Sequence, residues 1–337
     1  MTDWLHRTIP AERIAIARIV IGAYSTAYLV ARAASIARLA DLPASHWQPV
    51  GVAHVLPGGP LDAGVVWSLM ALGVVAGTLF TLGWRLGLTG PLFGGLLLVL
   101  TTYRNSWGQV FHTENLMVLH VLILAAAGTA GATASLDARR AGRWRRTVDG
   151  WPVRAMGIVT VITYVLAGVT KLRVAGGSWI DGDNLRHWIA YDNLRKIELG
   201  DLHAPLGGWL VQHAWVFTPI AVATLVVELG APIALLSTSW ARRWALAAWA
   251  FHVGVVALMA IVFPYPLLGI AYLPLLDAET LPGARRLIAW LGPTELDLRT
   301  TPQSVEVALG GSLRPQVRGL PASAREPGVP GAERPRR

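Results

Sequence analysis

Residues 64–100 read GVVWSLMALGVVAGTLFTLGWRLGLTGPLFGGLLLVL, two apolar runs joined by a connector that carries Arg85. A helix needs about 20 predominantly apolar residues to cross the roughly 30 Å hydrocarbon core of a bilayer. Extended to 61–83 and 86–103, the two runs are close to that length. A helix also satisfies its own backbone hydrogen bonds where no water is present. The stretch therefore predicts two transmembrane helices joined by a short turn.

The same pattern recurs along the chain. Of the 337 residues, 53% are hydrophobic and 15% charged, against roughly 25% charged residues in soluble domains. The sequence thus predicts an all-α integral membrane protein, a polytopic bundle of about eight helices. The last of these spans contains three prolines, Pro264, Pro266 and Pro274, so a re-entrant or kinked segment is the alternative there. The predicted spans are 14–34, 61–83, 86–103, 113–133, 153–172, 214–237, 243–263 and 264–280.

Charge predicts the orientation. The net charge of +9 comes mainly from Arg-rich connectors such as 135–154, a pattern typical of cytoplasmic loops rather than of a nucleic-acid-binding surface. With eight spans these connectors fall on one side. We therefore expect a multi-pass protein of the cell membrane with both termini in the cytoplasm and no nucleic-acid partner. Residues 1–282 form the predicted membrane domain, and 283–337 form a basic tail rich in Pro, Gly and Arg, for which we expect disorder.

The segment 173–213 is too polar to span the membrane and rich in Trp and Tyr. Such aromatic residues gather at the level of the lipid head groups. We expect one or two short interfacial helices there, over the outer end of the bundle. In the first two spans, Gly73 and Gly77 predict a close helix contact, and Arg18 is expected to extend toward the inner surface or to pair with an acid.

The predicted orientation brings polar residues of two spans to the same outer layer. Lys171 ends the fifth span, and His112, Glu114 and Asn115 begin the fourth. Ionisable residues within a membrane are functional hypotheses by default. At 100° per residue His112 and Asn115 share one helix face, whereas Glu114 points away. We therefore expect His112 and Asn115 to share a pocket, and Glu114 to stabilise the first helical turn behind an N-cap at Thr113.

Lys171 has two interpretations. In a dry pocket, desolvation favours the neutral amine, which accepts a proton. Alternatively the side chain extends along lipid to the head groups and has no chemical role. Deeper in the membrane, Glu228 must be protonated or paired, and His252 is either a proton relay or a hydrogen-bonded strut between helices. For His120 we expect the strut.

Other chemistries find no support in the sequence. The chain has no cysteine, no H-E-x-x-H motif and no histidine pair four residues apart, so no metal site is predicted. No nucleotide-binding Gly loop and no G-x-S-x-G motif occur. These absences disfavour ATPase, zinc-protease and serine-hydrolase functions.

Four stretches carry a family resemblance: HTENLMVLHVL (112–122), SLDARRAGR (135–143), YVLAGVTKL (164–172) followed by Trp179, and FHVGVVALM (251–259). Together they resemble the HTTM membrane domain, the family that includes vitamin K-dependent γ-glutamyl carboxylase. Glu228 in VVELGAP fits the same order. The resemblance covers residues 14–276 and implies a stand-alone membrane domain without the luminal domain of the carboxylase.

The resemblance implies a chemistry for the outer layer. In the carboxylase, reduced vitamin K is oxygenated to its epoxide, and a lysine at the place matched by Lys171 deprotonates the hydroquinone. The catalytic histidine of that enzyme is best matched by His112, offset by about one position. The implied catalytic residues are thus Lys171 and His112, with a reduced quinone as cofactor and no metal. The implied binding residues are Asn115, Trp179, His252 and Glu228.

Two hypotheses of different classes follow. The first is an enzyme in which Lys171 deprotonates a membrane quinol. The second is a non-catalytic module that binds lipid or quinone, or that serves as a subunit for a membrane-protein partner, with Lys171 as an anchor. A small-solute transporter is disfavoured because the sequence shows no inverted repeat.

Overall fold

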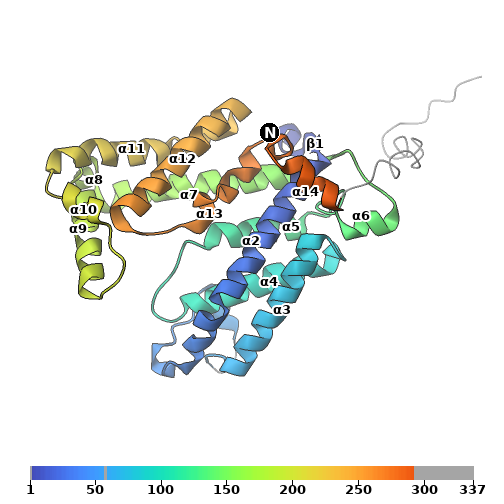
Figure 1. The fold of residues 1–337 in the computed structure, drawn as a ribbon, viewed down its shortest axis with the longest axis horizontal. Coiled ribbons are helices and arrows are strands. Elements are labelled where there is room, and N and C mark those ends of the chain that lie inside the picture. Colours follow the sequence, from blue (N-terminus) through green and yellow to red (C-terminus); the bar gives the residue numbers. More distant parts are fainter. Residues whose placement is uncertain (1, 57–58, 292–337) are drawn as a thin grey trace, which may run out of the picture.

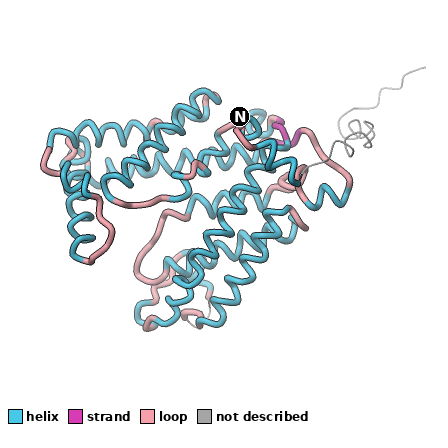
Figure 2. The backbone as a smooth tube through the Cα atoms, in the orientation of Figure 1, coloured by secondary structure: helices cyan, strands magenta, loops and turns pink. Residues whose placement is uncertain are grey.

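The computed structural model describes residues 2–56 and 59–291, and it is mostly helical (Figures 1 and 2). Its helices are α1 (Thr2–His6), α2 (Ala11–Ala37), α3 (Ala63–Leu82), α4 (Leu86–Asn105), α5 (Asn115–Ala126), α6 (Leu136–Ala141), α7 (Trp151–Ala175), α8 (Gly177–Ile180), α9 (Asp183–Glu198), α10 (Pro205–Leu210), α11 (Phe217–Leu229), α12 (Thr238–Met259), α13 (Pro264–Leu267) and α14 (Ala284–Leu291). The 3₁₀ helices are η1 (Arg38–Asp41), η2 (Ala44–His46), η3 (Gly51–Val55), η4 (Ala214–Val216), η5 (Ala231–Leu235), η6 (Ile270–Leu275) and η7 (Ala278–Thr280). The strands are β1 (Thr8–Pro10) and β2 (Thr147–Asp149).

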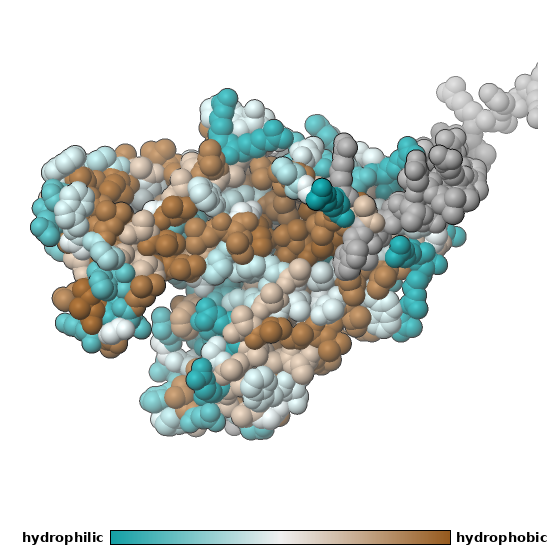
Figure 3. Space-filling model, in the orientation of Figure 1, coloured by the Kyte–Doolittle hydropathy of each residue, from teal (hydrophilic) through white to brown (hydrophobic). Residues whose placement is uncertain are grey.

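Five helical stretches of the described chain are long and apolar enough to cross a membrane: Ala11–Asp41, Ala63–Leu82, Leu86–Asn105, Trp151–Ala175 and Ala214–Leu235. At 1.5 Å per residue, 20 residues cover about 30 Å, the thickness of the hydrocarbon core. Figure 3 shows a broad apolar band across α7 and α12, with hydrophilic side chains toward α9 at one end and α6 at the other.

The expected count of eight spans is not confirmed. In place of the predicted span 113–133, α5 covers Asn115–Ala126, only 12 residues, because the Gly128–Gly131 region forms turns instead of helix. The predicted span 264–280 is not one helix either. Its prolines divide it into α13, η6 and η7, so the kinked alternative describes this segment.

Small residues allow the helices to approach closely, as the sequence predicts. A methyl group on Gly77 of α3 would overlap Thr26 of α2 and Phe93 of α4, and one on Gly73 would lie 3.1 Å from Leu29. The pair Gly73 and Gly77 is therefore a confirmed helix contact. Dense packing of this kind holds membrane helices together where lipid is as apolar as the side chains.

The predicted hydrogen-bonded role of His120 is also confirmed. Its side chain is fully buried. Nδ1 lies 2.8 Å from the hydroxyl of Tyr265, and Nε2 lies 3.1 Å from Thr160 Oγ1 and 3.2 Å from the Met156 carbonyl. The imidazole thus joins α5, α7 and α13 (Figure 1).

The prediction for Arg18 is wrong. The guanidinium neither extends to the surface nor pairs with an acid: it is fully buried, and Nη2 donates to the carbonyl of Ala134. No carboxylate of the described chain lies within 4.0 Å of it. The cause is that the turns before α6 present the carbonyl oxygen of Ala134 to this face of α2, an acceptor without charge.

One end of the bundle gathers the chain's basic connectors. Strands β1 and β2 pair there, with Ile9 opposite Val148. The His6 imidazole lies 2.7 Å from the Asp149 carboxylate, and this hydrogen bond holds the pKa of Asp149 below its ordinary value. Arg13 of α2 pairs at 2.6 Å with Asp277, so the segment after α12 returns to the end where α2 begins.

Candidate functional site

The site begins with a close approach of two helices. Gly168 of α7 faces α11 so tightly that an added methyl group would lie 2.8 Å from Leu229 and 3.1 Å from Cβ of Glu228. One helical turn further on, Lys171 projects toward the same helix. Its ammonium donates a hydrogen bond to Glu228 Oε1. The absence of a side chain at Gly168 therefore brings the two charged groups into contact.

The two partners of this ion pair differ in exposure. The Glu228 side chain is 2% exposed and the Lys171 side chain 22%. An isolated carboxylate at that depth would be strongly disfavoured, whereas a hydrogen-bonded partner of opposite charge offsets the cost. Of the two predicted alternatives for Glu228, protonated or paired, the structure contains the pair. Lys171 is directed to this carboxylate.

Two aromatic rings flank the amine. Nζ of Lys171 lies 5.2 Å from the centre of the Trp179 ring and 5.9 Å from that of Phe251. Trp179 is buried against Ala221 and Leu225 of α11, and it is brought there by α8, which follows a turn at Gly176 with φ of 55°. Rings at these distances stabilise a cation through their negative faces.

Below the ion pair, α7 and α12 share a chain of hydrogen bonds. The Tyr164 hydroxyl lies 2.9 Å from His252 Nε2 and 2.8 Å from the hydroxyl of Tyr272. Trp244 packs edge-on against the Tyr164 ring at 4.9 Å and donates to the Val227 carbonyl at 2.9 Å. The carbonyl acceptor is the residue next to Glu228, so one network connects the histidine with the carboxylate-bearing helix.

Two polar atoms of the site can each form a further hydrogen bond. Glu228 Oε2 and His252 Nδ1 are buried and have no hydrogen-bond partner within residues 2–56 and 59–291. Buried polar atoms in proteins are paired in the great majority of cases, so two unpaired atoms beside one ion pair mark a place where a further polar group fits. The site can thus accept at least one further hydrogen bond or proton beside the Lys171 amine.

The structure places His112 at the edge of this site. His112 is exposed, and its ring centre lies 6.0 Å from that of Phe263, which in turn lies 5.2 Å from the ring of His252. Asn115 is the first residue of α5 and is exposed. Of the six residues predicted from the sequence, four form one cluster: Lys171, Glu228, Trp179 and His252, the last through its contact with Phe251 at 5.0 Å.

The expected orientation at the start of the fourth span is wrong. Glu114 does lie on the opposite side from His112 and Asn115, but it is the buried residue, whereas His112 and Asn115, predicted to share a pocket, are exposed. The helix-face argument fails because α5 begins only at Asn115, so residues 110–114 do not follow the 100° period. The predicted N-cap at Thr113 is also wrong, since Glu114 occupies the N-cap position without a side-chain capping bond.

Glu114 instead forms a second buried cluster, which the sequence reasoning missed. Its Oε1 accepts a hydrogen bond from Arg104 at 2.6 Å and one from the Tyr28 hydroxyl at 2.9 Å. Arg104 also lies over the Phe111 ring at 3.8 Å. The sequence could have predicted this ion pair, because Arg104 and Glu114 lie at the two ends of one short connector and carry opposite charges.

Tyr164 and Tyr272 were missed as well. Tyr164 opens the stretch YVLAGVTKL seven residues before Lys171. Seven residues are close to two helical turns, so the two side chains lie on one face of α7. This periodicity was available from the sequence, whereas the partner Tyr272 comes from a segment 108 residues later.

Comparison with known proteins yields one match. The model of the HTTM domain family matches residues 6–277, nearly all of the described chain. No curated protein and no solved structure matches.

Proposed function

Because the chain belongs to the HTTM domain family, we propose that its Lys171–Glu228 pair is the proton-accepting centre of an enzyme that acts on a lipid-soluble quinol. The observation that carries this proposal is the position of the amine: it is bound to a buried carboxylate and lies 5.2 Å and 5.9 Å from the ring centres of Trp179 and Phe251. Fold alone does not determine function, so the proposal depends on these contacts.

The pair supplies the base. In the resting ion pair the amine already carries its proton and cannot accept another. Transfer of that proton along the hydrogen bond to Glu228 leaves a neutral amine, a change that the low dielectric of a membrane interior favours. The amine then takes the hydroxyl proton of the quinol, and the quinolate reacts with O₂. Overall, one quinol and one O₂ become one quinone epoxide and one water.

The surrounding residues have positioning roles in this scheme. Trp179 and Phe251 offer flat apolar surfaces against which a quinone ring packs. Nδ1 of His252 and Oε2 of Glu228 have free hydrogen-bonding capacity and orient the quinol oxygens or accept protons from them. His112 and Asn115 lie at the entrance, where they contact a substrate that enters from the bilayer.

We infer from the Arg-rich connectors at the opposite end of the bundle that the amine lies on the extracytoplasmic side. We infer both termini in the cytoplasm, eight crossings, and α8, α9 and α10 at the outer interface, where Trp188, Tyr191 and Trp209 are exposed. In this arrangement the broken segment 264–280 crosses inside the protein. Non-helical backbone is tolerated at membrane depth when protein covers it, and residues 271–274 are buried.

The test is direct. Wild type, Lys171→Ala, Glu228→Gln and Arg173→Ala are purified in detergent and given a reduced naphthoquinone with O₂, and the epoxide is measured by mass spectrometry. Arg173 is the matched control because it lies on the same helix but is exposed. We expect epoxide from wild type and Arg173→Ala, and none above background from the other two. Equal epoxide from Lys171→Ala and wild type would reject the proposal.

A second function is favoured by one feature of the same site. Glu228 neutralises Lys171 in the resting structure, which is sufficient for a module that binds quinone or lipid, or a membrane partner, without chemistry. Quenching of Trp fluorescence by added quinone distinguishes the two. Saturable quenching in wild type together with no epoxide from any quinol would favour the module.

A further inference from the structure

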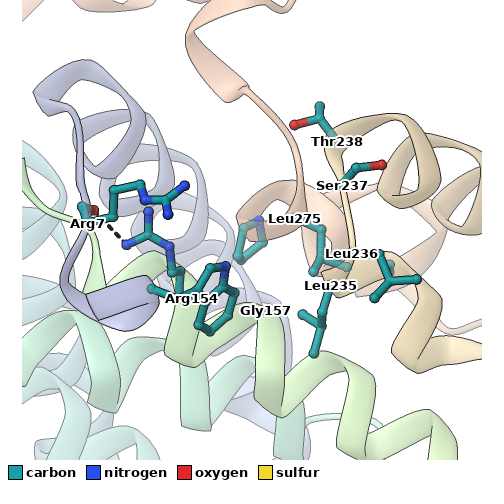
Figure 4. A pocket seen from close by; sticks show the side chains of 11 residues that line it. Arg7, Arg154, Gly157, Leu235, Leu236, Ser237, Thr238 and Leu275 are labelled. Atoms are coloured by element: carbon teal, nitrogen blue, oxygen red, sulfur yellow. Dashed lines mark hydrogen bonds between the residues drawn. The ribbon is translucent and has the colours of Figure 1, made fainter. Parts of the chain in front are cut away.

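A cavity lies far from the Lys171 site, at the end of the bundle with the basic connectors. Its volume is about 290 Å³, just below the roughly 300–1,000 Å³ typical of small-molecule pockets. It is bordered by the N-terminal end of α7 and by the junction between η5 and α12 (Figure 4). Arg7 and Arg154 form one side, and three leucines form the other: Leu235, Leu236 and Leu275.

The cationic side of the cavity is held in place by the backbone. Arg154 Nη1 donates to the carbonyls of Leu5 at 2.7 Å and Arg7 at 2.6 Å. Its guanidinium also lies 5.5 Å from the centre of the Trp4 ring. These contacts use one nitrogen and one face of the group, so Nε and Nη2 keep their donor capacity.

The positive charge of this side is not balanced locally. No carboxylate in the described part of the chain lies within 4.0 Å of Arg7 or Arg154. Asp149, the acid on the neighbouring strand β2, is already engaged by His6 at 2.7 Å and by the Trp151 amide at 2.9 Å. Two like charges border one cavity, which favours an anion between them.

The far rim adds a polar group. Figure 4 shows the Thr238 hydroxyl on the side that faces the two guanidiniums, whereas the Ser237 hydroxyl is turned away. Ser237 caps α12 by accepting from the Trp240 amide at 3.4 Å. An anion in the cavity therefore has guanidinium donors on one side and a hydroxyl donor on the other.

We propose that this cavity binds the phosphodiester head group of an anionic phospholipid. Guanidinium groups bind phosphate oxygens in pairs of parallel hydrogen bonds. The leucine side suits the first carbons of the acyl chains, which a soluble phosphate ester lacks. Basic pockets between transmembrane helices on the cytoplasmic side are suited to such head groups. This inference does not depend on the function proposed for the Lys171 site.

The experiment measures lipid binding by the full chain. Native mass spectrometry of the detergent-purified protein counts bound phosphatidylglycerol against phosphatidylcholine over a lipid titration. The variants are Arg7→Gln and Thr238→Val. Arg140→Gln is the matched control, because Arg140 is exposed and does not border the cavity. Arg154 is left unchanged since its side chain also holds the N-terminal segment.

We expect wild type and Arg140→Gln to retain phosphatidylglycerol in preference to phosphatidylcholine. Loss of one charged hydrogen-bond donor should weaken this binding roughly tenfold in Arg7→Gln, and Thr238→Val should weaken it less. Equal losses in Arg7→Gln and Arg140→Gln would overturn the site, because they would mean non-specific attraction to positive charge. Competition by glycerol phosphate at the same concentration as the lipid would overturn the lipid assignment in favour of a soluble phosphate ester.

Discussion

Gly168 and Glu228 are in direct contact where α7 packs against α11, with only 3.1 Å available between Cβ of Glu228 and a methyl group built on the glycine. This contact determines the distance between the two helices at the level of the Lys171 amine. The glycine is therefore as important for the ion pair as the two charged residues themselves.

Replacement of Gly168 by alanine should separate α7 from α11 and break the Lys171–Glu228 hydrogen bond. Overpacking of this kind costs about 1–3 kcal/mol. Thermal unfolding in detergent should therefore show a lower Tm for Gly168→Ala, and its rate of quinol epoxidation should fall below that of wild type. Gly254→Ala is the control, since no neighbouring atom of residues 2–56 and 59–291 lies within 4 Å of its Cβ position. Equal Tm values for the two variants would contradict the packing argument.

Glu228→Leu should destabilise the protein by about 3 kcal/mol, because it leaves the Lys171 ammonium without its partner. The double variant Lys171→Met/Glu228→Leu should recover most of this loss, since well-packed apolar residues replace buried ion pairs at little cost. Chemical denaturation of the two single variants and the double variant measures the coupling. Additive losses would mean that the two side chains do not interact.

Tyr164→Phe removes the hydroxyl between His252 and Tyr272. Leaving a buried polar group without its partner costs about 1–3 kcal/mol. We expect a lower Tm and slower epoxidation, with quinone binding unchanged because the aromatic ring remains. Tyr191→Phe on α9 serves as the control, since that side chain is 60% exposed. Unchanged stability in Tyr164→Phe would mean that the hydrogen bonds of the Tyr164 hydroxyl do not stabilise the fold.

Glu114→Gln and Asn115→Ala test the reversed orientation before α5. Glu114 is buried with Arg104 and Tyr28, so its loss of charge should cost about 1–3 kcal/mol. Asn115 is exposed, and its replacement should change stability by less than about 0.5 kcal/mol. Thermal unfolding measures the loss of stability in each variant. A larger loss in Asn115→Ala than in Glu114→Gln would mean that Asn115, and not Glu114, is the buried residue.

The absence of cysteine from the chain makes the orientation testable with single introduced thiols. Ser178→Cys lies beside Trp179, and Arg140→Cys lies on α6 at the opposite end. Both positions are exposed. A membrane-impermeant maleimide added to intact cells should label Ser178→Cys, whereas Arg140→Cys should react only after lysis. The reverse pattern would place the Lys171 site on the cytoplasmic side.

The sequence by itself determined the class of the protein and the main long helices. Apolar runs of membrane-spanning length and their Arg-rich connectors are local properties, and so is the close contact encoded by Gly73 and Gly77. The position of Lys171 near the end of α7 also follows from the length of its apolar run. Such features need no knowledge of neighbouring helices, because they depend on hydropathy and helical period alone.

The tertiary structure decided which polar groups meet. Helical period gives the face on which Lys171 lies, but the rotation of α11 decides that Glu228 is its partner, 57 residues later. The same holds for Tyr164 and Tyr272. For residues 110–114 even the local period fails, because the chain there is not helical and packing decides that Glu114 is buried. Within a membrane, a buried charge is strongly disfavoured unless another group compensates it, and for Glu228 that group comes from another helix.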